Sequence, residues 1–153
     1  AALEGAPRTE LHARVLVRMA VRSRGAQTAK VIRTAAIDFC QEEFHTLLHT
    51  EHDEPSEGST PSVRARRRVN VDMVAHLFLF DVVKEKVIIH VLHTLLYGAK
   101  DGSASDFDLE LFALLLSTVA LSLSDETHSG LLPGYMRDVE RRIPHMGGRA
   151  AHA

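Results

Sequence analysis

The segment from residue 28 to residue 50 carries apolar side chains at spacings of three and four positions, which is the period of an α-helix. Polar residues occupy the opposite side of this predicted helix, at Asp38, Gln41, Glu42 and His45. A helix that is apolar on one side must bury that side against another element. We therefore predict a packing helix whose buried side consists of Ile32, Ala35, Ala36, Phe39, Cys40, Phe44, Leu47 and Leu48.

Helical periodicity recurs along most of the chain, and no segment shows the alternation that is typical of a strand. Gly25 ends the first predicted helix, and Ser105 or Asp106 is a candidate N-cap for a later one. Pro144 and the glycines after it are expected to end the last helix. The predicted helices cover residues 10–24, 28–50, 63–80, 87–96, 107–123 and 135–143.

The segment 107–123 is apolar on almost every side, so it is predicted to be the most enclosed helix. Helix pairs in this order fit either a closed helical bundle or a stack of antiparallel pairs that forms part of an α-solenoid. An enclosed helix would contact both its own hairpin partner and the neighbouring pair, which favours the stack. We therefore expect an all-α fold built as an α-solenoid of stacked antiparallel helix pairs.

Composition agrees with a helical protein packed by aliphatic side chains. The 153 residues are 45% hydrophobic and 5% aromatic, with no Trp, which fits one helical domain of ordinary size. The single cysteine, Cys40, lies on a predicted apolar side and is expected to be a small buried hydrophobe. The longest apolar stretch, residues 111–123, is too short to cross a bilayer. The first residues lack the pattern of a secretory signal, so none is expected.

The charges are arranged in blocks, although the chain has 18 basic and 20 acidic residues. Four arginines lie within residues 64–68, at the start of a predicted helix, where positive charge opposes the helix dipole. Their anionic partner is either a set of acids in the chain or RNA phosphate. No aromatic residues interleave with them, so base stacking is not expected. The candidate RNA- or partner-binding residues are Arg14, Arg18, Arg22, Arg64, Arg66, Arg67 and Arg68, and the candidate internal acids are Glu51, Asp53, Glu54 and Glu57.

Residues 51–62, with the sequence EHDEPSEGSTPS, form a predicted acidic loop that contains two prolines and a glycine. The loop is longer than most connections in compact domains, so it is either functional or disordered. Just before it, Gln41, Glu42 and Glu43 form an acidic patch. This patch is either ordinary solvated surface or a surface that meets a protein partner.

The sequence offers little that resembles catalytic chemistry. His45, His49 and His52 have helical spacing and could approach one metal ion, whereas His90 and His93 flank an apolar helix side as boundary residues. No Ser, His and acid set and no Gly-rich phosphate loop is present. We therefore expect neither an enzyme nor a cofactor, and a helical bundle with a histidine metal site remains an alternative.

Three stretches together resemble the middle domain of eukaryotic translation initiation factor 4-gamma. The first is CQEEF, residues 40–44, and the third is DLELFALLLSTVALSLS, residues 108–124. The second, residues 64–96, resembles the basic run of that domain and the two helices that follow it. The positions of this second stretch that match the family are Asn70, Leu77, Phe78 and Glu85, and Ala75 stands where the family has Gly.

The resemblance covers roughly residues 10–143 and implies a HEAT-repeat stack that acts as a scaffold in translation initiation in the cytoplasm. Its implied main partner is a DEAD-box RNA helicase, initiation factor 4A, with RNA as a second ligand. A cap-binding factor would bind other parts of the full protein, and the domain would be a monomer. Residues 1–153 are then expected to be a single helical domain and an internal portion of the family's domain. Similar middle domains in nonsense-mediated decay and in the nuclear cap-binding complex are the alternative.

Overall fold

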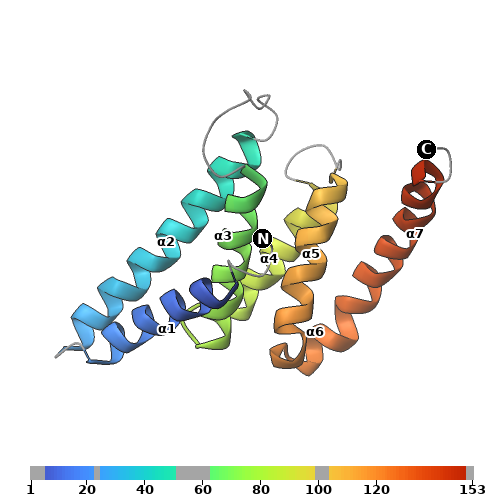
Figure 1. The fold of residues 1–153 in the computed structure, drawn as a ribbon. Coiled ribbons are helices and arrows are strands. Elements are labelled where there is room, and N and C mark those ends of the chain that lie inside the picture. Colours follow the sequence, from blue (N-terminus) through green and yellow to red (C-terminus); the bar gives the residue numbers. More distant parts are fainter. Residues whose placement is uncertain (1–5, 23–24, 51–62, 99–103, 151–153) are drawn as a thin grey trace. The chain divides into compact units, whose positions relative to one another are not determined.

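The computed structural model describes residues 6–22, 25–50, 63–98 and 104–150, and over these residues the chain is helical without strands (Figure 1). The all-α prediction is therefore confirmed. The helices are α1 (Ala6–Arg22), α2 (Ala26–Thr50), α3 (Val63–Leu79), α4 (Glu85–Tyr97), α5 (Asp106–Val119), α6 (Asp125–Gly130) and α7 (Leu132–Ala150), with a short 3₁₀ turn at Ala120–Ser122 after α5. The acidic loop predicted at residues 51–62 lies outside the described residues. None of the described helices has the length and apolar character needed to cross a bilayer.

The chain divides into two compact units, residues 1–88 and 89–153, with the boundary inside α4. In the first unit, α1, α2 and α3 each contact the other two. Apolar side chains from all three helices, from the turn after α3 and from the start of α4 form its core, because each helix turns one side inward. Among the residues whose side chains the structure describes, the buried apolar ones of this unit are Ala13, Cys40, Phe44, Leu47, Val71, Val74, Ala75, Leu77, Val83 and Ile88.

α3 ends in a turn in which Asp81 adopts a left-handed backbone conformation. Asp81 has a φ of 61°, and the backbone N–H groups of Val82 and Val83 donate to the Leu77 carbonyl at 2.9 and 3.2 Å. These bonds satisfy a carbonyl that the last turn of the helix would leave without a partner. The break predicted near residues 81–86 is therefore present.

The stability of Asp81 variants should depend on how easily the new residue adopts a positive φ. Because a Cβ makes this conformation unfavourable, Asp81→Gly should raise the free energy of unfolding by up to about 1 kcal/mol. The β-branched variant Asp81→Val should lower it by about 1 kcal/mol. Urea denaturation followed by circular dichroism measures both, and a Val variant more stable than the Gly variant would contradict the described turn.

In the second unit, α5 begins with a capping box. The backbone N–H of Asp108 donates to the Ser105 hydroxyl at 3.1 Å, and the Ser105 N–H donates to the Asp108 carboxylate at 2.8 Å. This arrangement pairs two backbone donors at the start of the helix. Of the two N-caps considered from the sequence, Ser105 is therefore the residue used.

The prediction that residues 107–123 form the most enclosed helix is wrong, since α4 has fewer exposed positions. One side of α5 is buried, but Leu114 is 36% exposed and Leu121, in the turn after the helix, is fully exposed. Ser117 and Thr118 lie near this open side and donate their hydroxyls to the Leu114 carbonyl, each at 2.9 Å. A helix can pack stably with a single apolar stripe, so an apolar composition does not require enclosure. The residues that α5 buries are Phe107, Leu111, Phe112, Leu115 and Val119.

The last helix is longer than predicted. α7 runs from Leu132 to Ala150, although Pro144 and the two glycines after it were expected to end it near residue 143. Proline removes one backbone hydrogen bond and glycine lowers helix propensity, but these are local costs that the rest of a helix can offset. The six-residue helix α6, which contacts α7, lies in a segment that the sequence analysis treated as a connection.

Candidate functional site

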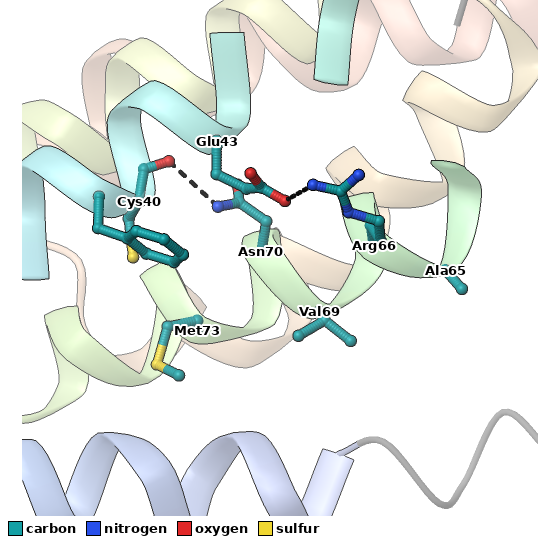
Figure 2. A pocket seen from close by; sticks show the side chains of 8 residues that line it. Cys40, Glu43, Ala65, Arg66, Val69, Asn70 and Met73 are labelled. Carbon is teal, nitrogen blue, oxygen red and sulfur yellow. Dashed lines mark hydrogen bonds and ion pairs between the residues drawn. The ribbon is translucent and has the colours of Figure 1, made fainter. Parts of the chain in front are cut away.

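A groove of about 300 Å³ lies between α2 and α3 in the first unit (Figure 2). Its position follows from helical spacing, because residues three and four positions apart share one side of each helix. Most of the groove wall is apolar, and the volume is at the lower end of the range for small-ligand sites. The lining residues are Phe39, Cys40 and Glu43 from α2, and Ala65, Arg66, Val69, Asn70 and Met73 from α3.

Asn70 connects the two helices at the buried side of the groove. Its side chain is 6% exposed, and its Nδ2 donates to the backbone carbonyl of Cys40 at 3.1 Å (Figure 2). Its Oδ1 has no hydrogen-bond partner among the described residues. A buried amide oxygen without a partner costs about 1–3 kcal/mol, and this oxygen is covered by the surrounding side chains and does not open into the groove.

Arg66 and Glu43 form an ion pair across the groove. The Arg66 guanidinium donates to the Glu43 carboxylate at 2.6 Å, and both side chains remain partly accessible to solvent (Figure 2). A pair this exposed contributes about 0–1 kcal/mol to stability. Its main effect is to hold the Arg66 side chain beside the apolar wall.

Cys40 is unsuited to nucleophilic chemistry at neutral pH. Its side chain is buried, and burial together with the negative charge of Glu43 raises the pKa of the thiol to about 11. The reactive thiolate is therefore scarce near pH 7. The prediction of a small buried hydrophobe at this position is confirmed.

Two positions of the predicted buried side of α2, Ala35 and Phe39, are exposed in the structure. Cys40, Phe44 and Leu47 are buried as expected, but Phe39 is 69% exposed at the groove. Val69, on the facing helix, is 47% exposed. The groove is therefore bordered by two large apolar side chains that water reaches. The predicted exposed residues of α2, namely Asp38, Gln41, Glu42 and His45, are all exposed.

The seven candidate arginines fall into separate groups. Arg14, Arg18 and Arg22 are exposed on α1, which also exposes Leu11, Val15 and Met19. At the start of α3, the side chains of Arg64, Arg66 and Arg68 are exposed, whereas Arg67 is only 3% exposed and does not belong to the basic surface.

The acidic partner seen for Arg66 is not one of those proposed from the sequence. Arg66 pairs with Glu43 of the CQEEF stretch. The four acids considered in the sequence analysis lie within residues 51–62, outside the described residues. Glu43 is therefore half-buried and paired, whereas Gln41 and Glu42 remain exposed.

The histidine hypothesis falls only partly on described residues. His45 is exposed, whereas the side chain of His49 and all of His52 lie outside the described part of the chain. Within that part, no three or more His, Cys, Asp or Glu side chains are grouped as metal ligands would be. His90 and His93 are exposed at the edge of the buried side of α4, as expected for boundary residues.

A second polar contact lies in the second unit, where the Tyr97 hydroxyl donates to the Asp138 carboxylate. The Tyr97 ring packs near His93 and Tyr135, and Tyr135 also meets Phe112 edge-on. The hydrogen bond to Asp138, followed by burial and by the charge of Asp138, raises the pKa of Tyr97 to about 12. Tyr97 therefore joins α4 to α7 as a neutral donor.

The Tyr97 contact should disappear at high pH. A group whose pKa is raised on folding stabilises the protein below its unfolded pKa, here 10.0, and loses that contribution as the pH rises through about 12. The stability difference between the unmodified chain and Tyr97→Phe should therefore stay constant from neutral pH to about 10 and then shrink toward pH 12. Thermal melts at a series of pH values measure this difference. A difference that stays constant to pH 12, or tyrosine absorbance showing Tyr97 ionising near pH 10, would contradict the contact.

Sequence reasoning missed the groove and the Tyr97 contact. One usable signal was present in α3, whose buried stripe contains Arg67 and Asn70 among apolar residues. Polar side chains in such a stripe require specific partners. For Tyr97 and Asp138, which are 41 residues apart, no local pattern connects the two positions.

Comparison with known proteins identifies no relative of this chain. No protein-family model, no curated protein and no solved structure matches it.

Proposed function

We propose that this chain is a non-enzymatic helical scaffold of the initiation factor 4-gamma middle-domain type, which binds the DEAD-box helicase initiation factor 4A in the cytoplasm. In this proposal its helices form HEAT-like stacked pairs, and RNA is a second ligand. The proposal rests on the resemblance of the three sequence stretches. It assigns the chain no catalytic residue and no cofactor.

One observation supports the proposal most directly. Two of the stretches that carry the resemblance contact each other through residues of their motifs. Asn70, at the position of the family's Asn, donates to the carbonyl of Cys40 in the CQEEF stretch. Arg66, in the basic run, pairs with Glu43 of the same stretch. Two motifs that are separate in the sequence therefore form one local structure.

The exposed side of α1 is the surface that we assign to the helicase. Leu11, Val15 and Met19 recur at intervals of four and are each about half exposed. Apolar side chains exposed together mark a surface for protein partners. The nearby exposed arginines add positive charge, which would attract an acidic protein surface or RNA phosphate.

In the proposed mechanism, the chain holds the two lobes of the helicase in a favourable relative orientation. A DEAD-box helicase closes its two lobes around ATP and RNA, and a scaffold that contacts both lobes reduces the orientational freedom lost on closure. Such a scaffold shifts the helicase population toward the closed form without taking part in the chemistry.

The RNA-dependent ATPase of the purified helicase tests this function. Adding the chain should raise the ATPase rate at subsaturating RNA. The variant Arg18→Glu/Arg22→Glu should weaken this effect, whereas Lys30→Glu/Arg33→Glu, which makes the same charge change at exposed positions of α2, should retain it. An ATPase rate that does not change when the chain is added would contradict the proposal. Capture of decay-pathway helicases in place of initiation factor 4A would assign the chain to the decay scaffold.

A further inference from the structure

The beginning of α2 extends beyond the core of the first unit. No side chain from Ala26 to Phe39 is buried, and Cys40 is the first residue of α2 that is. α1 ends at Arg22, shortly before this segment, so the last turns of α1 and the first turns of α2 meet at one end of the helix pair (Figure 1). We call this region the hairpin end, and it comprises Arg18, Met19 and Arg22 from α1 and residues 26–35 from α2.

The hairpin end is strongly basic. Between Glu10 and Asp38 the sequence has six Lys and Arg residues and no Asp or Glu. Among the described residues, no acid forms an ion pair with the exposed cations of the hairpin end. Their charge is therefore available to an anionic surface outside the chain. These cations are Arg18, Arg22, Lys30 and Arg33.

Large apolar side chains are exposed among these cations. Met19 is 54% exposed and Val31 is 56% exposed, and both lie on helical turns that also carry the cations. Nucleic-acid phosphate would pair with the cations but would leave Met19 and Val31 in water. The hairpin end also has no aromatic side chain that could stack on a base. The combination therefore fits a ligand that presents anionic groups above an apolar layer.

We propose that the hairpin end binds the surface of an anionic lipid bilayer. The four cations lie at the level of the lipid phosphate and carboxylate groups, while Met19 and Val31 enter the boundary between the headgroups and the acyl chains. Long aliphatic stems let Lys and Arg keep their charge among the headgroups while apolar side chains beside them go deeper. Because the hairpin end extends beyond the core of its unit, this contact leaves that core packed.

This inference goes beyond the proposed function and does not rest on it. The hairpin end shares Arg18 and Arg22 with the surface of α1 that we assign to the helicase. Lys30 and Arg33 belong only to the hairpin end, and their Glu variant is expected to retain the effect on the helicase ATPase. Vesicle binding is measured without the helicase, so either proposal can fail while the other holds.

Sedimentation of the purified chain with lipid vesicles tests this inference. Vesicles of phosphatidylcholine with about 30% phosphatidylserine should bind the chain half-maximally on the order of 1 mM accessible lipid. Vesicles of phosphatidylcholine alone should bind it at least about tenfold more weakly, because they carry no net negative charge. Raising the salt concentration from about 0.1 M to about 0.5 M should release the chain from the anionic vesicles, because salt screens exposed charges.

Two charge variants locate the basic part of the contact. Lys30→Glu/Arg33→Glu should weaken binding to the anionic vesicles at least about tenfold, because it replaces attraction by repulsion at the hairpin end. Lys84→Glu/Lys86→Glu makes the same charge change at exposed positions near the start of α4 and should weaken binding by less than about threefold.

Two apolar variants test whether the hairpin end enters the bilayer. Met19→Ser/Val31→Ser leaves the net charge unchanged and should weaken vesicle binding about tenfold, because the two side chains no longer gain from leaving water. Val69→Ser, at a valine that is 47% exposed on α3, is the control and should have little effect. Far-UV circular dichroism checks that each variant keeps its helical content.

Several outcomes would overturn the inference. The first two are the absence of binding to anionic vesicles and equal binding to the two kinds of vesicle. Equal losses from the two charge variants, or from the two apolar variants, would place the contact elsewhere. Binding of single-stranded RNA without binding of vesicles would assign the cations to RNA. Self-association of the chain that Met19→Ser/Val31→Ser abolishes would assign the hairpin end to a second copy.

Discussion

Replacing Leu115 by Ala is expected to lower the free energy of unfolding by roughly 2–5 kcal/mol. Leu115 is completely buried on the inner side of α5. Removing its side chain loses the transfer free energy of three carbons and leaves a cavity that the surrounding helices fill only in part. Urea denaturation, followed by the helical signal in circular dichroism, measures the effect.

Leu121→Ala is the matched control for this prediction. Leu121 lies six residues further along the same apolar run but is fully exposed, so its truncation should change stability by less than about 0.5 kcal/mol. Both leucines lie in the segment that sequence alone predicted to be enclosed. Equal losses from the two variants would support that original prediction and contradict the arrangement described for α5.

Replacing Asn70 by Ala is expected to lower the free energy of unfolding by about 2–3 kcal/mol. The variant loses the hydrogen bond to the Cys40 carbonyl, worth about 1 kcal/mol, and also leaves unfilled space between α2 and α3. Thermal and urea denaturation measure the loss.

Asn70→Leu separates the two contributions. Both variants lack the amide, but leucine fills nearly the same volume as asparagine, so the difference between them measures the contribution of the filled space. The Leu variant should therefore be more stable than the Ala variant by about 1 kcal/mol. A Leu variant no more stable than the Ala variant would contradict close packing of α2 and α3 at this position.

Helix positions and caps were the part of the fold that could be predicted from sequence. The period of apolar residues placed α2 and α4, and Ser105 followed by Asp108 has the spacing of a capping box. These features depend on residues only a few positions apart. The end of α7 could not be predicted in the same way, because one proline and two glycines lower the stability of a helix without fixing where it stops.

The width of the buried stripe on each helix could not be predicted. Periodicity indicates which residues share a side, but the width of the buried stripe depends on what packs against it. Phe39 lies beside Cys40 on the apolar side of α2, yet only Cys40 is covered. The buried stripe of α5 is also narrower than its apolar sequence, since Leu115 is buried and Leu114 is not.

The candidate site could be predicted only as separate pieces. The arginines of residues 64–68 and the CQEEF stretch were both identified from the sequence, but not that Arg66 would meet Glu43 or that Asn70 would meet Cys40. These contacts are separated by 23 and 30 residues, so they depend on how α3 packs on α2. The sequence likewise placed Arg67 with its neighbours, whereas packing buries it.

Gel filtration with light scattering tests the central claim most directly. It measures the mass of each peak that elutes from a mixture of this chain and the purified helicase initiation factor 4A. The proposed scaffold function predicts one peak whose mass is that of the helicase plus 16.9 kDa, together with a monomer of 16.9 kDa when the chain is run alone. Two peaks that keep their separate masses at concentrations of tens of micromolar would contradict it, since even a micromolar complex would persist under those conditions.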